Sequence, residues 1–568
     1  MAVNPSIQLG TSGNWAIKED NLLAYKQLGN KFFDREFDFS RGTTATFVGR
    51  NGFIQESGLN GTEIVTNGDF ATDSDWSKTN ATISNGLATI TVTNGGYSAI
   101  NQSITYATGK EYIITAQVQG LSGSSGKQIK FQDRGNNTGG LNIANGLITL
   151  DETLQNIEIS WTANSNSDII VISRSSNSGD YSFTIDNVSI KEIQLDVPRI
   201  DFTDDPTGHL LLEPQSTNLI PYSSDYSNGW VYFDASTSAN TLISPSGVLD
   251  ASKFIEGSGS SIKRIINLSQ SIVSGNDYTF SIFAKKGERD FITLTNNTGS
   301  ADVTTTFDLT NGTVTSGIGS INSFTNGWFR CSRSFTATAT VTSSYIAQAF
   351  INNGSGIFYQ GDGTSGIYIW GAQLEELSYP TSYIPTSGST STRNQEICNN
   401  SGTVNDFNSE EGVLYADISA LADDGTARTI SINNTASNRV FLQLRAASGQ
   451  VVSGVVKNGV VQGFASYSIS QTSNIKLAIK YKQNDFSLFV NGAKIATTSG
   501  DVFTSGTLNS LNFSSGSGAV VASTEYFFGK TKNVKAFKRA LTDTELYLLT
   551  VTQYQSYQEM ATALNYTL

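Results

Sequence analysis

Short runs in which apolar and polar residues alternate recur along most of the chain, and a period of two is typical of half-buried β-strands. The alternation holds over residues 112–118, 278–282 and 475–481. Turn residues separate these runs, as in FSLFVNGAKI, where Asn491-Gly492 predicts a tight hairpin turn. We therefore predict an all-β protein.

One strand near the middle of the chain changes its pattern along its length. Tyr181, Phe183 and Ile185 share one face, after which Val188 and Ile190 continue on the opposite parity. An extra residue in one strand of a pair produces this switch, so we predict a β-bulge near Asp186-Asn187.

Two segments have a helical pattern. Trp15, Leu22, Tyr25 and Leu28 lie near helical spacing and predict a short amphipathic N-terminal helix. Near the other end, Thr542 and Glu545 form a T-x-x-E capping box that predicts the start of a short helix.

Composition supports the all-β prediction. The chain has 568 residues, of which 38% are hydrophobic and 15% charged, with 53 glycines and only 8 prolines. Threonine and aromatic residues suit a pleated sheet, while glycine and asparagine supply turns. The length indicates three to four domains.

Charge and apolar runs exclude several classes of protein. A net charge of −13 argues against nucleic-acid binding, which depends on lysine and arginine contacts to phosphate. No apolar run approaches the roughly 18 residues of a membrane span, and no ordinary export signal follows Met1. Cys331 and Cys398 lack metal-like spacing, so we expect reduced, buried thiols.

A motif is split between two distant stretches, which we call the split motif. Its halves are FDFSRGTTATFVGRNGFIQE, Phe37 to Glu56, and VPRIDFTDDPTGHLLLEPQSTNLIP, residues 197–221. Joined, they resemble a segment of bacteriophage fibre and spike proteins. The resemblance implies that about Gly61 to Ile193 is an inserted compact domain with neighbouring ends.

Three further stretches resemble known modules. Asn67-Gly68-Asp69-Phe70 and the strand ending at Ile190 resemble the two ends of jelly-roll carbohydrate-binding modules. Residues 216–230 and 366–377 parallel those ends in a second module. FVNG and KRALTDTEL, in residues 406–550, resemble the concanavalin A/laminin-G type of lectin sandwich.

The predicted fold is all-β, with tandem jelly-roll and concanavalin A-like β-sandwiches behind a short N-terminal helical anchor. The domain map is 1–36, N-terminal attachment segment; 37–60 plus 194–215, split fibre motif; 61–193, inserted jelly roll; 216–378, second jelly roll; 379–405, extended linker; 406–550, concanavalin A/laminin-G-like sandwich; and 551–568, C-terminal tail.

The resemblance to jelly-roll modules implies one metal site. Such modules often hold a structural calcium between their first and last strands, where Asp69 and Asp186 stand here. Carboxylate oxygens suit this hard cation. The alternative is that the two acids cap strand ends.

No catalytic residues are assigned. His209, the one histidine, follows Gly208 between apolar strands without a serine or cysteine motif, so a structural role is favoured. Asp73, Asp75 and the pair Asp204-Asp205 are interpreted as solvated turn acids, although a glycosidase pair is not excluded by counting.

Glycan-binding residues stay unassigned. Sugars stack on exposed aromatic rings beside polar groups. Trp76, Trp230, Trp328 and Trp370 stand at recurrent motif positions and are interpreted as core residues. The freer aromatic candidates are Tyr97, Tyr345 and Tyr359.

The family resemblance predicts a non-enzymatic virion protein, a head or tail fibre or spike. It implies a homotrimer that attaches to other virion proteins through its N-terminal segment and displays lectin-like domains to host-surface glycans. A polysaccharide depolymerase and a bacterial surface adhesin are the alternatives. The first would favour a short regular repeat and the second an export signal, and the sequence shows neither.

Overall fold

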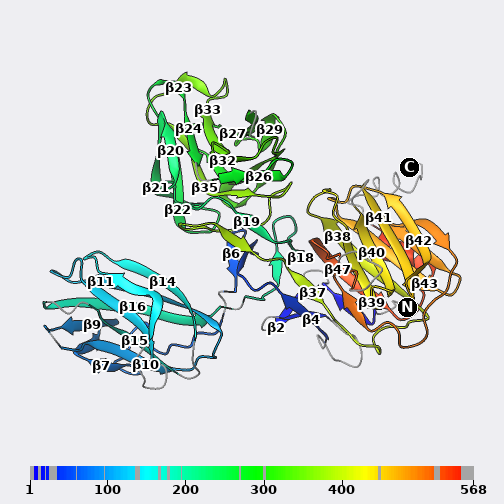
Figure 1. The fold of residues 1–568 in the computed structure, drawn as a ribbon, viewed down its shortest axis with the longest axis horizontal. Helices are drawn as coiled ribbons and strands as arrows, with labels where there is room; N and C mark the ends of the chain where they lie inside the picture. The colour runs from blue at the N-terminus through cyan, green and yellow to red at the C-terminus, as the bar shows by residue number, and fades with distance from the viewer. Residues whose placement is uncertain are drawn as a thin grey trace. The chain divides into compact units, whose positions relative to one another are not determined.

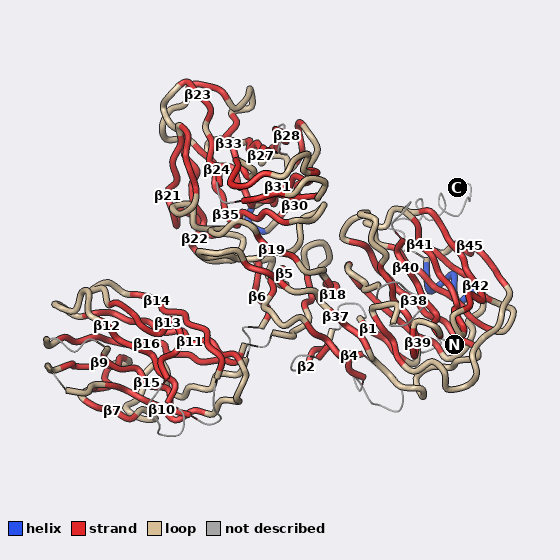
Figure 2. Tube along the Cα trace, in the orientation of Figure 1, coloured by secondary structure: helices blue, strands red, loops and turns tan. Residues whose placement is uncertain are grey.

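The computed structural model divides the chain into two compact units, Ser57–Leu195 and Met1–Glu56 with Asp196–Leu568. Figures 1 and 2 show that strands dominate both. The structure describes residues 5–10, 15–18, 21–24, 35–58, 61–94, 96–134, 141–163, 168–175, 179–193, 195–267, 270–297, 302–445, 449–516 and 525–551. The all-β prediction is confirmed by the antiparallel sheets, and the described residues include one α-helix.

The inserted unit is a sandwich of two five-stranded antiparallel sheets, drawn in blue to cyan in Figure 1. One sheet has the order β13-β12-β15-β10-β7 and the other β14-β11-β16-β9-β8. The strands are β7 Ser77–Thr79, β8 Ala81–Ser84, β9 Leu87–Val92, β10 Ala99–Ile104, β11 Glu111–Gly120, β12 Gln128–Arg134, β13 Leu141–Thr149, β14 Gln155–Thr162, β15 Asp168–Arg174 and β16 Tyr181–Glu192.

The predicted alternation and bulge are both present in this sandwich. Tyr112, Ile114, Ala116 and Val118 of β11 all lie in its core. The β11–β16 register shifts between Thr115 and Gln117, opposite the predicted bulge. The asparagine there, Asn187, has φ 51°, a left-handed conformation that asparagine adopts more readily than most residues.

The ends of the inserted unit pair with each other. Glu63 forms an antiparallel bridge with Lys191, and the Ile64 N–H donates to the Ile190 carbonyl at 3.0 Å. Chain entry and exit are therefore adjacent, which is the geometry of a domain inserted into a loop.

The second sandwich repeats the strand order of the inserted one. Its sheets are β20-β24-β33-β27-β28-β29 and β21-β22-β35-β26-β31-β30, which add edge strands β29 and β30. The strands are β20 Trp230–Phe233, β21 Ala235–Ile243, β22 Leu249–Glu256, β24 Arg264–Asn267, β26 Asp277–Lys286, β27 Phe291–Asn297, β28 Asp302–Asp308, β29 Thr313–Ser316, β30 Ser320–Ser323, β31 Phe329–Thr336, β33 Ala347–Asn352 and β35 Gly366–Glu375. Short pairs β23 Ser260–Ile262 with β34 Phe358–Gln360, and β25 Gln270–Ile272 with β32 Val341–Ser344, border it.

The third sandwich draws strands from three parts of the chain. Its eight-stranded sheet has the order β17-β18-β47-β38-β43-β44-β45, and β1 also pairs with β47. Its five-stranded sheet has the order β42-β41-β40-β39-β46. The strands are β1 Ile7–Leu9, β17 Arg199–Asp201, β18 His209–Leu212, β38 Glu411–Ala420, β39 Arg428–Thr435, β40 Asn438–Arg445, β41 Gln450–Lys457, β42 Val460–Ser468, β43 Ile475–Lys482, β44 Phe486–Val490, β45 Ala493–Thr498, β46 Ser510–Asn512 and β47 Gly529–Phe537.

Local signals in the third sandwich behave as predicted. Val490 pairs with Ala493 across Asn491-Gly492, whose φ angles of 48° and 84° give the left-handed pair that a tight hairpin turn requires. Helix α1, Asp543–Thr550, begins with the Thr542/Glu545 capping box.

The predicted N-terminal helix is wrong. β2 Ala16–Lys18 pairs with β3 Asn21–Ala24, and β3 pairs with β4 Arg35–Ser40. An isolated helix of this length is marginal in water, so strand pairing, which satisfies the same backbone groups, prevails. Trp15 packs against the third sandwich, whereas Tyr25 and Leu28 lie outside the described residues.

The N-terminal strand β1 also belongs to the third sandwich. Ile7 and Leu9 are 0% and 1% exposed within its core. Residues 7–9 of the predicted N-terminal attachment segment are therefore part of the third sandwich.

The stretch 379–405 is packed rather than a linker. β36 Ser391–Arg393 pairs with β19 Ser216–Asn218, and β37 Ile397–Asn399 pairs with β4. Thr381, Tyr383, Arg393 and Glu396 along it are all buried. Its Pro/Ser/Thr composition predicted an extended linker, but Thr381, Arg393 and Glu396 are partners for buried charged groups.

Those charges form what we call the arginine–glutamate cluster: Arg41, Arg199, Glu213, Arg393 and Glu396. Arg199 lies 2.8 Å from Glu396 Oε1 through Nε and 2.9 Å from Glu213 Oε2 through Nη2. Arg41 and Arg393 each add an ion pair, at 2.8 and 2.9 Å, to Glu396 and Glu213. The cluster thus joins both halves of the split motif to residues 379–405.

The cluster keeps its glutamates ionised despite burial. Burial alone would raise the pKa of Glu213, but Arg393 and Arg199 outweigh it and lower that pKa to about 2. The pKa of Glu396 is likewise lowered, chiefly because Arg199 and Arg41 oppose the effect of burial.

Both cysteines are free and buried, as predicted. Burial raises the pKa of the Cys331 and Cys398 thiols, so both stay protonated at neutral pH. None of the helices in the described part of the chain has the length and apolar character needed to cross a membrane.

Candidate functional site

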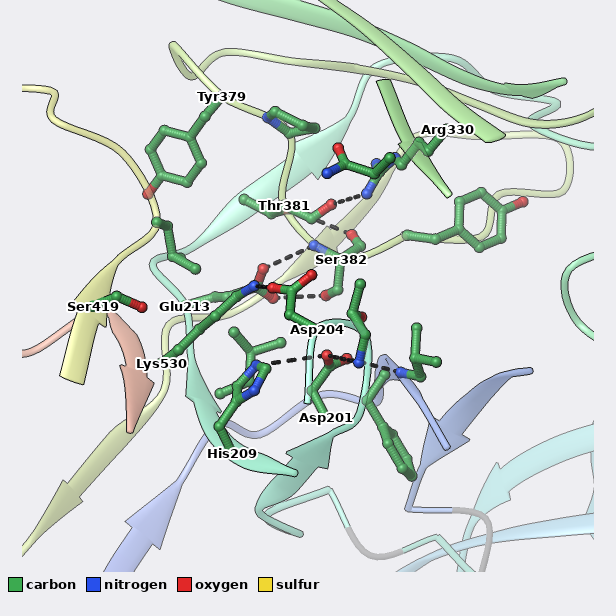
Figure 3. A pocket seen from close by; sticks show the side chains of 18 of the residues that line it. Asp201, Asp204, His209, Glu213, Arg330, Tyr379, Thr381, Ser382, Ser419 and Lys530 are labelled. Carbon is green, nitrogen blue, oxygen red and sulfur yellow. Dashed lines mark hydrogen bonds and ion pairs between the residues drawn. The ribbon is translucent and has the colours of Figure 1, made fainter. Parts of the chain in front are cut away.

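A cavity of about 610 Å³ opens in the larger unit, where the split motif meets the second and third sandwiches. Figure 3 shows Asp201, His209 and Glu213 on one side of it, with Tyr379, Thr381 and Ser382 on the segment that crosses above them. The split motif therefore supplies the inner wall, and residues 379–383 supply part of the opposite one.

His209 is the least expected residue of this wall. It begins β18, its side chain is 1% exposed, and its Nε2 lies 3.6 Å from Asp201 Oδ1. That Nε2 has no hydrogen-bond partner among the described residues. Burial lowers the pKa of His209 to about 4, against the opposing effect of Asp201, so the imidazole is neutral near pH 7.

Asp201 is held by backbone groups. Its Oδ2 accepts the Val48 N–H at 2.8 Å, and its Oδ1 accepts the Thr203 N–H at 2.9 Å. The carboxylate thus bridges the two halves of the split motif and fixes the wall beside His209.

Two ion pairs stand near the cavity mouth. Lys530 pairs with Asp204, and Lys532 pairs with Asp205. Burial would raise the pKa of Asp205, but Lys532 and Thr207 lower it to about 2. The prediction of solvated turn acids is thus incomplete, because strand β47 lies alongside and supplies both lysines.

The arrangement does not assemble a His-based catalytic group. His209 Nε2 has no hydroxyl or thiol within hydrogen-bond distance among the described residues, and its imidazole is buried and neutral. The structural role predicted for His209 fits this geometry, although the residue lines a cavity rather than filling a turn.

A second candidate surface is the outward face of the β20-β24-β33-β27-β28-β29 sheet, which we call the aromatic face. Ile265, Ala347, Ala349, Ile292 and Leu294 point into the core, so alternate residues point outward. Cross-strand pairing aligns the outward residues in two rows: Phe233, Arg264, Phe350, Thr293 and Thr306; and Val231, Ile266, Gln348, Thr295 and Thr304.

The aromatic face combines stacked rings with a line of polar groups. The Arg264 guanidinium lies 4.3 Å from the Phe233 ring centroid and 5.9 Å from that of Phe350. Its Nη1 donates to Gln348 Oε1 at 3.2 Å. Phe233 is 37% exposed, so the stack reaches solvent at one edge of the sheet.

Further along this face, some polar groups form hydrogen bonds with each other and others have no hydrogen-bond partner among the described residues. Asn352 Nδ2 donates to Thr293 Oγ1 at 3.1 Å, and Thr293 Oγ1 lies 2.9 Å from Thr306 Oγ1. Thr295 Oγ1 and Arg264 Nε are buried without a partner among the described residues. Gln348, Thr293, Thr295 and Phe350 are only 2–4% exposed, so the part of this face that a ligand can reach is its edge at Val231, Phe233 and Arg264.

The aromatic residues singled out from the sequence fall into a buried group and an exposed group. Trp76, Trp230, Trp328 and Trp370 are all buried, as predicted. Tyr97 is 40% and Tyr345 49% exposed, and the Tyr345 carbonyl accepts Gln348 Nε2 at the aromatic face.

Tyr359 is instead fixed, because its hydroxyl donates to Glu256 at 2.7 Å. Sequence reasoning missed Phe233 and Arg264, because the face forms only when five strands, β20, β24, β33, β27 and β28, pair.

Asp69 and Asp186 act locally in the inserted sandwich. Asp69 Oδ1 accepts the Ala71 N–H at 3.3 Å, and Asp186 Oδ1 accepts the Asn187 N–H at 2.7 Å. Asp69 lies in a turn and Asp186 lies within β16, at the register shift against β11. Across the residues that the structure describes, no group of three or more His, Cys, Asp or Glu side chains could hold a metal ion.

No protein-family model and no curated protein matches the chain. Among solved structures, the tandem CBM22 domain of Paenibacillus barcinonensis Xyn10C is 11% identical with a TM-score of 0.22, covering 56% of this chain and 98% of that one. Domains LG4-5 of the mouse laminin α1 chain are 11% identical with a TM-score of 0.19, covering 50% and 91%. Trypanosoma rangeli sialidase in complex with sialic acid is 10% identical with a TM-score of 0.20, covering 90% and 97%. Similarities this distant say nothing about the activity of this chain.

Proposed function

We propose that this chain is a non-enzymatic glycan-binding adhesin of a bacteriophage virion, a head or tail fibre or spike. The observation that carries glycan binding is the accessible edge of the aromatic face, where the Phe233 ring, 37% exposed, lies against the partly exposed guanidinium of Arg264. Sugar rings present C–H faces that stack on aromatic rings, and their hydroxyls take hydrogen bonds. Both kinds of group lie here on one rigid sheet.

The virion assignment rests on the resemblance of the split motif to fibre and spike proteins. The arginine–glutamate cluster gives that motif a physical role, since it locks both halves to residues 379–405 around buried charges. On this proposal the protein is located in the virion, forms a homotrimer and contacts other virion proteins through residues 1–36. The trimer and the attachment derive from family resemblance alone.

Glycan binding is tested with the full-length chain on an array of bacterial surface glycans. Phe233→Ala should weaken binding at least about tenfold, or about 1.4 kcal/mol, because it removes the exposed ring of the stack. Phe464→Ala is the matched control, since Phe464 is 44% exposed but lies on β42 of the third sandwich. Equal loss in both variants, or in neither, would refute the proposal.

The depolymerase alternative makes a separate prediction. A depolymerase releases oligosaccharide from host capsule, whereas the proposed adhesin retains the polymer and leaves it intact. Incubation with purified capsule followed by measurement of new reducing ends separates the two, and any protein-dependent release contradicts the non-enzymatic assignment.

A structural calcium between Asp69 and Asp186 stays part of the proposal. The two carboxylates would supply oxygen ligands, and backbone carbonyls would complete the shell that this cation prefers. Calcium calorimetry on the full chain against an Asp69→Asn/Asp186→Asn variant tests it. If no heat of calcium binding is measured at calcium concentrations below the millimolar range, or if the heat is the same in the variant, the two acids do not bind calcium.

A further inference from the structure

The cavity of Figure 3 lies away from the aromatic face and is not used by the proposed adhesion. Its volume of about 610 Å³ falls within the ~300–1,000 Å³ typical of small-molecule sites. Its inner wall is built on β17 and β18 of a continuous sheet, so its shape is set by regular structure. A preformed cavity of this size is large enough to bind a small molecule.

His209 gives the first indication. His209 lines the cavity, and its Nε2 is buried with no hydrogen-bond partner among the described residues. A buried polar atom left without a partner is costly, and native structures rarely leave one unexplained. A ligand hydroxyl would supply the missing hydrogen bond if the imidazole turns its Nε2 toward the cavity.

The charges around the cavity indicate a neutral ligand. Lys530 and Lys532 are each neutralised by an aspartate, and Glu213 is neutralised by two arginines of the cluster. Two further charged groups line the cavity, and both are hydrogen-bonded: Arg330 donates to the Thr381 carbonyl and to Ser281 Oγ, and Asp201 accepts two backbone N–H groups. A phosphate or a free cation would therefore compete with an existing ion pair or hydrogen bond. A ligand with many hydroxyls can instead donate to the carboxylates and accept from the ammonium groups while the pairs persist.

Apolar groups complete the lining. Leu211 and Phe324 line the cavity beside the amides of Asn322 and Asn474. Alternating apolar and hydrogen-bonding surface matches the two faces and the hydroxyl edge of a sugar ring. Aliphatic ligands would leave the amides and His209 unsatisfied.

We propose that this cavity is a binding site for a short neutral saccharide, with His209 as one of its hydrogen-bond partners. The site is separate from the aromatic face, so this proposal does not depend on glycan binding at that face. It would let one chain hold a sugar between its second and third sandwiches while the aromatic face engages another part of the same or a different glycan.

The single histidine of the chain makes a direct test possible. Histidine labelled with ¹³C in the full-length protein gives one set of ring signals, all from His209. Maltotriose, cellotriose and chitotriose are titrated separately to about 10 mM, a range that detects millimolar affinity. We expect a saturable shift of the His209 signals with at least one trisaccharide and none with inorganic phosphate.

Two variants on one edge strand locate the effect. Asn322 lines the cavity and is exposed, so Asn322→Trp should block the mouth and abolish the shift. Ser323 is also exposed but does not line the cavity, so Ser323→Trp should keep it. Phe233→Ala should also keep the shift, which separates this site from the aromatic face.

The proposal is overturned if none of the trisaccharides moves the His209 signals. It is also overturned if the shift survives in Asn322→Trp with less than about a tenfold loss of affinity, or if phosphate alone produces it. The last result would identify an anion site instead.

Discussion

The inserted sandwich and the second sandwich share one strand order but differ on their matching outward faces. In the second, the paired positions hold Phe233, Arg264 and Phe350. In the first, the outward positions of β7, β10 and β15 hold only small, amide or aliphatic side chains: Ser77, Thr79, Ala99, Asn101, Ser103, Ile169, Val171 and Ser173. The shared topology therefore does not by itself predict binding. On our proposal, the side chains of the face decide it.

The two sandwiches also differ in how they join the rest of the chain. The inserted one is a compact unit whose ends pair with each other. The second is tied to the split motif by a separate apolar cluster that includes Val48, Ile54, Phe283, Trp370 and Tyr383. The first can thus be exchanged as a module, whereas the second is part of the framework.

The largest expected effect comes from breaking the arginine–glutamate cluster. Arg199→Met leaves Glu213 and Glu396 buried with fewer partners and should destabilise the larger unit by about 3–5 kcal/mol. Hydrogen exchange should show lost protection in residues 197–221 and 379–405, with residues 61–193 unchanged.

Arg539→Met is the control for that variant. Its ion pair with Glu545 is exposed, so its removal should cost less than about 1 kcal/mol. Loss of protection across the inserted sandwich in Arg199→Met would contradict the separation of the two units.

Trp370→Ala should cost about 3 kcal/mol, because Trp370 packs 4.5 Å from the Tyr383 ring and 5.4 Å from that of Phe283. These rings lie between the second sandwich and the split motif, so docking of the two should loosen before the sandwich core does. Folded Trp370→Ala protein should keep its glycan binding.

Trp161→Ala is the matched substitution in the inserted sandwich, where Trp161 packs against Tyr106 and Tyr112. Denaturant unfolding should assign its loss to that unit alone. A shared transition that shifts equally in both tryptophan variants would show that the sandwiches unfold together.

Stability should also depend on pH through His209. Its folded pKa of about 4 lies below the usual value of 6.5, so between these values the unfolded chain binds the proton first. The free energy of unfolding should therefore fall by about 3 kcal/mol as pH drops through this window. His209→Gln should lose this slope, and an unchanged slope would contradict a buried neutral imidazole.

The smallest effect is expected from removing the inserted sandwich. Joining Gly58 to Asp196 should change the free energy of unfolding of the rest by less than about 1 kcal/mol, because entry and exit lie side by side. Calorimetry should show one component missing and the others unmoved. Aggregation of the shortened chain would contradict the modular insertion.

The sequence predicted what depends on neighbouring residues. The Asn491-Gly492 turn, the bulge at Asn187 and the Thr542/Glu545 cap all follow from local chemistry, and all are present. Alternation also separated inward from outward positions in β11.

The predictions that failed concern residues whose partners lie far away in the chain. The helical spacing from Trp15 gave way to strand pairing with β4, and the polar stretch 379–405 is buried against Arg199 and Glu213. The aromatic face needs Phe233, Arg264 and Phe350 to meet from three strands, which no local pattern encodes.

The central claim, that the second sandwich carries glycan binding and the inserted one does not, has one direct test. The full-length chain, the chain with Gly58 joined to Asp196, and Phe233→Ala are compared on the same glycan array. The account predicts that the shortened chain keeps the glycan pattern of the full-length protein and that Phe233→Ala loses it. Loss of binding in the shortened chain together with its retention in Phe233→Ala would contradict the account.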